Sequence, residues 1–360
     1  MNQANAKQWS IRDASALGLI LIVLLAILIF SLLVAVTFGT VDIPVRDVYD
    51  IIVTKLRHSL LLGDSTWGDG SLFRVVWYIR LPRLILAIGI GMGLSVCGVV
   101  MQAIVKNPLA DPYVLGVSSG ASLGATSAIM LGVGQAFGQN SIGIMAFLGA
   151  FAISLAVVAL ANIGGRASSI KLLLAGSALS AVCGAFSSFI VYTANNVEGM
   201  RTIQYWLMGA LGGATWELNS AVLPVVICGT LFFVSQHRTL NLMLLGDEVS
   251  ITLGTNLHTW RQFYLLVSSA LVGFSVYSAG MIGFVGLVIP HVVRMAVGTD
   301  HKKLIPVSAL VGAIFMIWAD VACRTILPRQ ELPIGILTSM IGAPCFIYLM
   351  IKKRYGFGGK

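Results

Sequence analysis

RLPRLILAIGIGMGLSVCGVVMQAIVKNPLADPYVLGVSSGASLGA, residues 80–125, is the most informative segment of the sequence. Residues 84–105 are 22 positions without a charge, which at about 1.5 Å per residue is enough to cross a hydrocarbon core of roughly 30 Å. Glycines within this run indicate the close approach of another helix, because apolar burial alone cannot drive helix association in lipid. The prolines of residues 106–112 then force a turn. The stretch therefore predicts two membrane-spanning helices joined by a short loop.

Composition extends this prediction to the whole chain. Hydrophobic residues make up 57% of the 360 positions and charged residues 10%, whereas a soluble domain carries about 25% charged residues. Apolar runs of spanning length, uncharged except for Arg294 and Asp320, recur at 14–38, 84–105, 113–133, 141–163, 172–194, 218–236, 262–279, 281–297, 304–323 and 334–351. We therefore predict an all-α polytopic membrane protein with about ten transmembrane helices, in which residues 1–360 form a single transmembrane domain.

Basic residues predict the orientation in the membrane. An even number of spans places both termini on one side, and the basic residues at the two ends indicate the cytoplasm. These residues are Lys7, Arg12, Lys352, Lys353, Arg354 and Lys360. Residues 39–79 then form an extracytoplasmic first loop with a short helix near 45–56, and residues 237–261 form a cytoplasmic loop of two short helices separated at Gly246. The net charge of +9 is scattered over loops and chain ends, which argues against binding to nucleic acid.

Several motifs resemble those of the FecCD family, the permease subunits of ABC importers for iron-siderophores, haem and cobalamin. They are RLPR at 80–83, GVVMQ at 98–102, NPLADPYVLGVSSGA at 107–121, GFVGLVIPHVVR at 283–294 and ELPIG at 331–335. The resemblance covers nearly the whole chain. It implies the architecture of a type II ABC importer permease in the cell membrane of a bacterium or archaeon.

The resemblance also implies partners and a cargo. Two copies, as a homodimer or as a heterodimer with a close paralogue, would form the translocation path, with two cytoplasmic ABC ATPase subunits and an extracytoplasmic substrate-binding protein. The sequence contains no G-x-x-x-x-G-K-[ST] loop, so we expect the partner ATPase to use the ATP and this chain to bind no cofactor or metal. The implied cargo is a metal chelate. A ferric siderophore is favoured because such importers are the commonest in the family, and haem and cobalamin are the alternatives.

Two cytoplasmic sites follow from the resemblance. The first is the ATPase-coupling segment LGDEVSITLG, which matches the family at Gly246, Asp247, Glu248, Leu253 and Gly254. Val249, Ser250 and Ile251 depart from the usual small and basic residues of this segment. The second is a cytoplasmic gate built from two loops, which hold Asn107 with Leu109 and Ser168 with Ser169.

A third site is expected at the extracytoplasmic mouth. Arg80 and Arg83 flank Pro82 directly before a span, and a proline at a helix start fixes the local backbone. By resemblance, these two arginines and Arg324 dock the binding protein through its surface carboxylates. The alternative is that the three side chains reach lipid headgroups.

Two other functions have a basis in single motifs. Residues 116–120, GVSSG, match the nucleophile elbow G-x-S-x-G, so an intramembrane serine protease with Ser118 or Ser119 as nucleophile and His291 as base is a remote alternative. That chemistry needs a strand-turn-helix context, and here the motif opens a membrane helix. Asp320 lies within an apolar span, which keeps a proton-coupled secondary transporter as an alternative. Arg324, one helical turn later, is expected to neutralise that carboxylate.

Overall fold

The computed structural model describes residues 3–39, 43–58, 70–163, 165, 167–328 and 330–352, which are helical and contain no strand. The α-helices are α1 (Gln3–Ala35), α2 (Val45–Arg57), α3 (Ser71–Arg74), α4 (Leu81–Val105), α5 (Val117–Leu131), α6 (Ser141–Asn162), α7 (Ser169–Ala194), α8 (Val197–Leu207), α9 (Trp216–Ser235), α10 (His237–Leu245), α11 (Asp247–Thr252), α12 (Leu257–Ala279), α13 (Val285–Val297), α14 (His301–Thr325) and α15 (Ile334–Lys352). Parts of two predictions lie outside the described residues, namely 40–42 and 59–69 of the first loop and the topology residues Lys353, Arg354 and Lys360. The side chains of Lys7, Arg12 and Lys352 are also outside the described part of the chain.

Each of the ten predicted spans corresponds to a helix. Seven helical stretches within the described residues are long and apolar enough to cross a membrane, and they include α1, α4, α6, α7, α9, α12 and α14. Three shorter apolar helices, Val117–Leu131, Val285–Val297 and Ile334–Tyr348, account for the other three predicted spans. The predicted all-α membrane fold is therefore confirmed.

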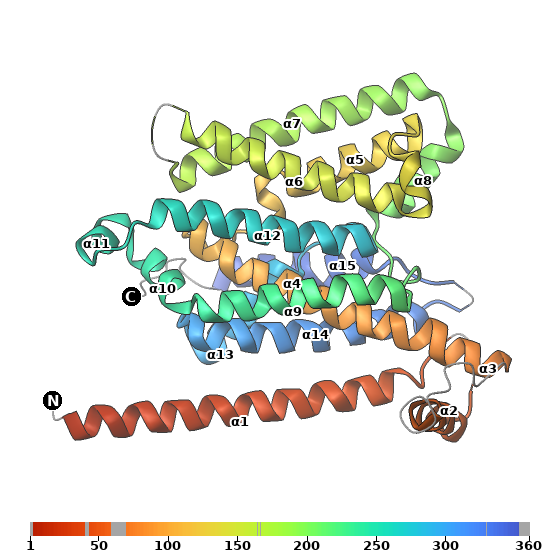
Figure 1. Ribbon diagram of the computed structural model, residues 1–360, viewed down its shortest axis with the longest axis horizontal. Helices are drawn as coiled ribbons and strands as arrows, with labels where there is room; N and C mark the ends of the chain where they lie inside the picture. The colour runs from red at the N-terminus through yellow and green to blue at the C-terminus, as the bar shows by residue number, and fades with distance from the viewer. Residues whose placement is uncertain are drawn as a thin grey trace.

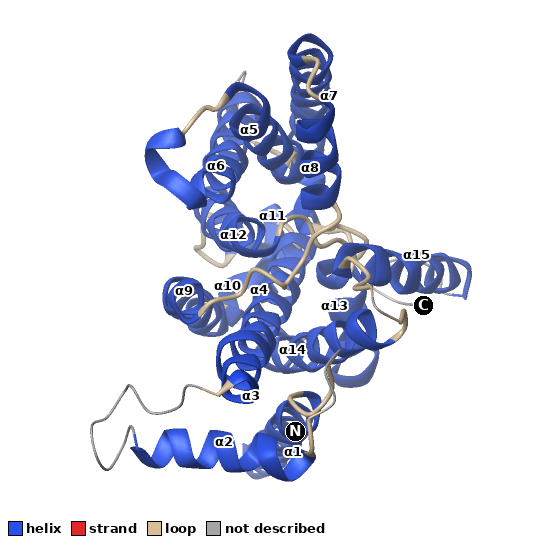
Figure 2. Cartoon of the chain, turned by 90° about the vertical axis from the view of Figure 1, so that its right-hand side faces the viewer, coloured by secondary structure: helices blue, strands red, loops and turns tan. Residues whose placement is uncertain are grey.

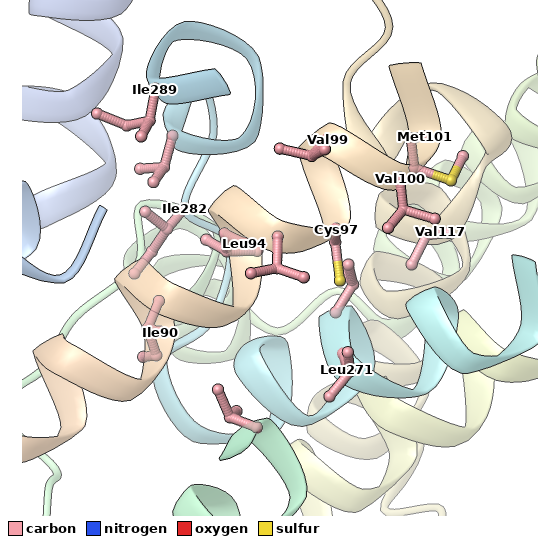
Figure 3. Close-up of a cluster of buried hydrophobic side chains, with 14 of the residues drawn as sticks. Ile90, Leu94, Cys97, Val99, Val100, Met101, Val117, Leu271, Ile282 and Ile289 are labelled. Carbon is pink, nitrogen blue, oxygen red and sulfur yellow. The ribbon is translucent and has the colours of Figure 1, made fainter. Parts of the chain in front are cut away.

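Helix α4 lies at the centre of the bundle. It packs against α9, α12, α13 and α14, and its side chains meet Leu271 of α12 and Ile289 of α13 in the buried cluster of Figure 3. Its glycines permit this packing, because a Cβ at Gly91 would overlap the carbonyl of Gly312, and one at Gly98 would overlap the carbonyl of Gly286. The expectation that this span faces protein is correct.

The two ends of the bundle carry different short helices. The short helices α10 and α11 lie at one end, together with the start of α1, and α2 and α3 lie at the other (Figure 1). We call these the α11 end and the α2 end. At the α2 end, the Tyr49 hydroxyl donates to the Leu33 carbonyl at 2.8 Å, which ties α2 to the last turns of α1. The predicted helix near 45–56 is α2, and it lies at the edge of the bundle, beside and nearly perpendicular to α1 (Figure 2).

The helices of the middle of the chain form a group beside this core. Helix α5 packs against α6, α7 and α8, and α6 in turn packs against α12. Figure 2 shows this group, α5 to α8, joined to the remainder of the bundle through α12. Helices α1 and α7 bury few of their own side chains within the chain, so most of their apolar surface faces outward.

Candidate functional site

Helix α11 projects from the bundle at a glycine hinge. Gly246 separates α10 from α11 with φ 105° and ψ 165°, a conformation that side chains disfavour and glycine tolerates. The buried Ser250 hydroxyl donates to the Gly246 carbonyl at 2.6 Å and to the Leu242 carbonyl at 3.1 Å. Those two bonds fix α11 against α10, a role that sequence reasoning missed when it noted Ser250 only as a departure from the family pattern.

The outer face of α11 combines charge with apolar surface. Glu248, Val249 and Ile251 are exposed, and Leu253 is exposed directly after the helix. Gly254 follows with φ 79°, which ends the segment in a left-handed turn. The structure therefore brings all five predicted coupling residues into one short projecting element, with the predicted break at Gly246 confirmed.

The first predicted gate loop follows α4 directly. Lys106 ends the helix with a left-handed φ of 56°, and the Asn107 side chain accepts from the Leu109 amide at 2.9 Å. Asp111 closes the loop by accepting from the Tyr113 amide at 2.8 Å. Burial raises the pKa of Asp111 to about 6, against the opposing effect of that amide. Side-chain turns of this kind stabilise the loop around Pro108 and Pro112, whose backbone nitrogens have no hydrogen to donate.

The second predicted gate loop lies against the first. Ser168 caps α7 by accepting from the Lys171 amide at 3.3 Å, and the Ser169 hydroxyl donates to the Ile104 carbonyl in the last turn of α4 at 3.2 Å. Sequence reasoning grouped these two loops by family resemblance alone. The structure brings them together through this hydrogen bond.

Asp247 connects α11 to both loops. Its Oδ1 accepts from Arg261 Nη2 at 2.6 Å and from Lys106 Nζ at 3.4 Å. Arg261 is buried in α12, and its Nη1 donates to the Ala167 carbonyl at 3.3 Å. Partial burial acts to raise the pKa of Asp247, but Arg261 and Lys106 outweigh it and the pKa lies below its usual value. Arg261 was not predicted as a site residue, and a single arginine at the start of an apolar span was the available signal.

The three predicted arginines converge at the α2 end. Arg83 Nε contacts Asp320 Oδ1 at 2.6 Å, and Arg324 Nη2 lies 3.0 Å from Asp320 Oδ2. A second carboxylate, Glu331, lies 2.7 Å from Arg83 Nη1. The predicted pairing of Asp320 with Arg324 is confirmed. Because two guanidinium groups hold this buried carboxylate, it is poorly suited to carry protons for a secondary transporter.

Two of these arginines also donate hydrogen bonds to backbone carbonyls at the end of the first span. Arg80 Nη1 donates to the carbonyls of Val36 and Thr37 at 3.0 and 2.9 Å, and Arg324 Nη1 donates to the Phe38 carbonyl at 2.9 Å. A helix end leaves such carbonyls without partners of its own. Arg80, Arg83 and Arg324 are only 3%, 6% and 5% exposed, whereas the side chain of Glu331 is 45% exposed. The role of the three arginines in docking the binding protein stays a prediction. The structure shows in addition that they bind carbonyls at the end of α1 and the carboxylates of Asp320 and Glu331.

The family of the chain follows from comparison with known proteins. The model of the FecCD transport family matches residues 27–352. The chain belongs to this family. Permeases named "Vitamin B12 import system permease protein BtuC" from Salmonella arizonae and Salmonella typhi are each 42% identical over 294 residues, which is 81% of this chain and 86% or 87% of theirs.

Solved structures agree with this assignment. The chain superposes with a TM-score of 0.78 and 30% identity on an inward-facing metal-chelate type ABC transporter, covering 93% of this chain and 100% of the other. PsaBC from Streptococcus pneumoniae shares the fold at a TM-score of 0.54 and 16% identity, covering 84% of this chain. The architecture is that of a type II ABC importer permease, and the protein is a transport subunit rather than an enzyme.

The serine protease alternative is therefore wrong. Ser118 and Ser119 lie in the first turn of α5, and His291 lies in α13, which packs against α4, α14 and α15.

Proposed function

We propose that this FecCD permease imports a metal chelate of the corrinoid class, to which vitamin B12 belongs. The observation that carries the proposal is the 42% identity, over 81% of the chain, with permeases named for vitamin B12 import. The sequence-based preference for a ferric siderophore rests on how common such importers are, whereas this identity is a property of the chain itself. Ferric siderophores and haem are the competing cargoes in the test below.

Energy for transport comes from a separate ATPase that docks on α11. The sequence has no phosphate-binding loop of the Walker type, and α11 offers exposed apolar side chains of Val249, Ile251 and Leu253 beside the charge of Glu248. Exposed apolar side chains beside a charged one are typical of a protein–protein interface. The α11 end then faces the cytoplasm of a bacterium or archaeon, and the chain binds no cofactor of its own.

A second copy of the chain completes the translocation path. Helix α7 exposes Phe186, Phe189 and Tyr192, and α15 exposes Met340 and Tyr348, so within the described residues neither apolar face is covered by helices of the same chain. In a homodimer these faces line the contact between the copies and the path that the chelate follows. Oligomers of one chain with two-fold symmetry use the same patch on both copies.

The soluble binding protein docks at the α2 end. The position of Arg80, Arg83 and Arg324 in one cluster at that end supports this assignment. Glu331 is the half-exposed member, and it pairs with Arg83 at 2.7 Å. A carboxylate of the binding protein would therefore reach Arg83 most directly by taking the place of Glu331.

Uptake by reconstituted vesicles tests the cargo. The permease, its ATPase and its binding protein are placed in proteoliposomes, and uptake of cobalt-labelled cyanocobalamin is compared with uptake of iron-labelled siderophore and of haem. We expect ATP-dependent uptake of the corrinoid, unaffected by a hundredfold excess of either competitor. Saturable uptake of siderophore or haem, with none of the corrinoid, would refute the proposed cargo while leaving the importer assignment in place.

A further inference from the structure

Asp247 occupies a position that joins three parts of the α11 end. It is the first residue of α11, it contacts Lys106 at the end of α4, and it contacts Arg261 of α12. Lys106 directly precedes the loop of Asn107 and Leu109. Arg261 in turn holds the Ala167 carbonyl, which directly precedes the loop of Ser168 and Ser169. One carboxylate is thus connected to both gate loops.

The two contacts of Asp247 differ in strength. The Arg261 contact is short, at 2.6 Å, and its guanidinium group is buried, so the loss of its anion would leave a buried charge without compensation. The Lys106 contact is longer, at 3.4 Å, between groups that water reaches. Arg261 therefore holds α11 firmly to α12 and to the second gate loop, while Lys106 is free to exchange its partner when α11 moves.

Other contacts bind α11 to its own helix pair. The Ser250 hydroxyl donates to carbonyls of α10 and of the Gly246 hinge, so it keeps the two short helices together as a unit. The hinge itself lies close to the first gate loop, because a Cβ at Gly246 would lie 3.7 Å from Lys106 Nζ. Movement of α10 and α11 as a unit is then transferred to the gate at Asp247.

We propose that Asp247 is a positioning residue that transmits displacement of α11 to both gate loops, through Lys106 to the first and through Arg261 to the second. This inference rests on the proposed function, in which an ATPase moves α11. The ion pairs keep the loops in step because both end on the same carboxylate oxygen. Without the negative charge of that carboxylate, α11 moves and the gate does not follow.

Coupling ratios in the reconstituted importer test this proposal. Asp247→Asn keeps the size of the side chain and an acceptor oxygen but removes the charge. We expect chelate uptake per ATP hydrolysed to fall about tenfold, the factor expected when a charge-assisted hydrogen bond becomes a neutral one. Lys302→Gln, an exposed change at the same end of the bundle, is the matched control and should leave this ratio unchanged.

Two further variants separate transmission from a purely structural role. The charge swap Asp247→Arg with Arg261→Asp should restore part of the uptake per ATP lost by Asp247→Arg alone. Lys106→Gln removes the solvent-accessible ion pair with Asp247. It should lower uptake per ATP without weakening ATPase binding, measured by co-elution of the subunits. A purely structural role would instead lower co-elution, ATP hydrolysis and uptake together.

Two results would overturn the inference. One is an unchanged uptake per ATP in both Asp247→Asn and Lys106→Gln, and the other is a loss of uptake that always follows the loss of ATPase binding. Failure of the proposed function would be seen separately, because the unmodified complex would then show no ATP-driven uptake in the same vesicles.

Discussion

We predict that the cluster of Arg83, Asp320, Arg324 and Glu331 contributes strongly to the free energy of unfolding. Asp320→Asn preserves the shape of the side chain and removes its charge. The carboxylate is fully buried and lies within 3.0 Å of two arginine side chains, Arg83 and Arg324. Together with Glu331 these residues form a set of two positive and two negative charges. The substitution leaves a net positive charge in a buried place.

The expected loss is large for a single substitution. The charge-assisted hydrogen bond from Arg83 Nε to Asp320 contributes about 1.5–3 kcal/mol, and Arg324 Nη2 adds an ion pair at 3.0 Å without hydrogen-bond geometry. We expect a total loss of roughly 3–5 kcal/mol, the range for removing one partner of a buried ion pair. Glu331→Gln is the control, because its side chain is 45% exposed and an exposed pair contributes about 1 kcal/mol or less.

Thermal unfolding in detergent measures this difference. Tryptophan fluorescence, followed at one scan rate because many large proteins unfold irreversibly, should show a decrease in midpoint several times larger for Asp320→Asn than for Glu331→Gln. In Arg324→Gln with Asp320→Asn, the combined loss should be smaller than the sum of the two single losses, because both partners of one pair are removed. Equal midpoints for the two single carboxylate variants would refute this account of the cluster.

Three further predictions test other parts of the structure. Gly98→Val should prevent the contact of α4 with the Gly286 carbonyl and abolish accumulation in the membrane, whereas Gly184→Ala, at an open position, should accumulate normally; equal accumulation would contradict the packing. The pKa of Asp111, raised to about 6 by burial, means that the folded state holds its proton more tightly than the unfolded state. Stability should therefore fall as pH rises from about 4 to 6, and Asp111→Asn should lack this fall; parallel midpoints for both proteins across pH 4–8 would disprove it. Arg83→Glu should weaken docking of the binding protein, and a Glu→Arg change on that partner should partly restore it; docking that is never restored and that does not depend on salt would limit the arginine to its internal role.

Local sequence predicted the spans well because apolar length is a local property. The apolar run 84–105 corresponds to α4, whose start at Leu81 lies three residues earlier. The prediction began at residue 84 because Arg80 and Arg83 are charged. In the folded chain, Arg83 is neutralised by Asp320 and Glu331, which lie 237 and 248 residues away along the sequence. No local pattern contains that information.

The candidate sites were predictable to different degrees. The hinge at Gly246 and the turns at Pro108 and Pro112 were visible in the sequence, because glycine and proline restrict the backbone in known ways. The link between the two gate loops was not visible, since it depends on Ser169 meeting the end of α4. Arg261 was missed for the same reason, because its partners Asp247 and Ala167 come from different segments. Helix α8 was also missed, because its charged residues interrupt any apolar run.

The energy source of transport distinguishes the permease of an ATP-driven importer from a secondary transporter. Proteoliposomes that contain the chain with its ATPase and binding protein are compared with proteoliposomes that contain the chain alone, each with ATP or with an imposed proton gradient. We expect chelate accumulation in the complete system with ATP, and none for the chain alone under either condition. Accumulation by the chain alone, driven by the proton gradient, would contradict the claim that it is the permease of an ATP-driven importer.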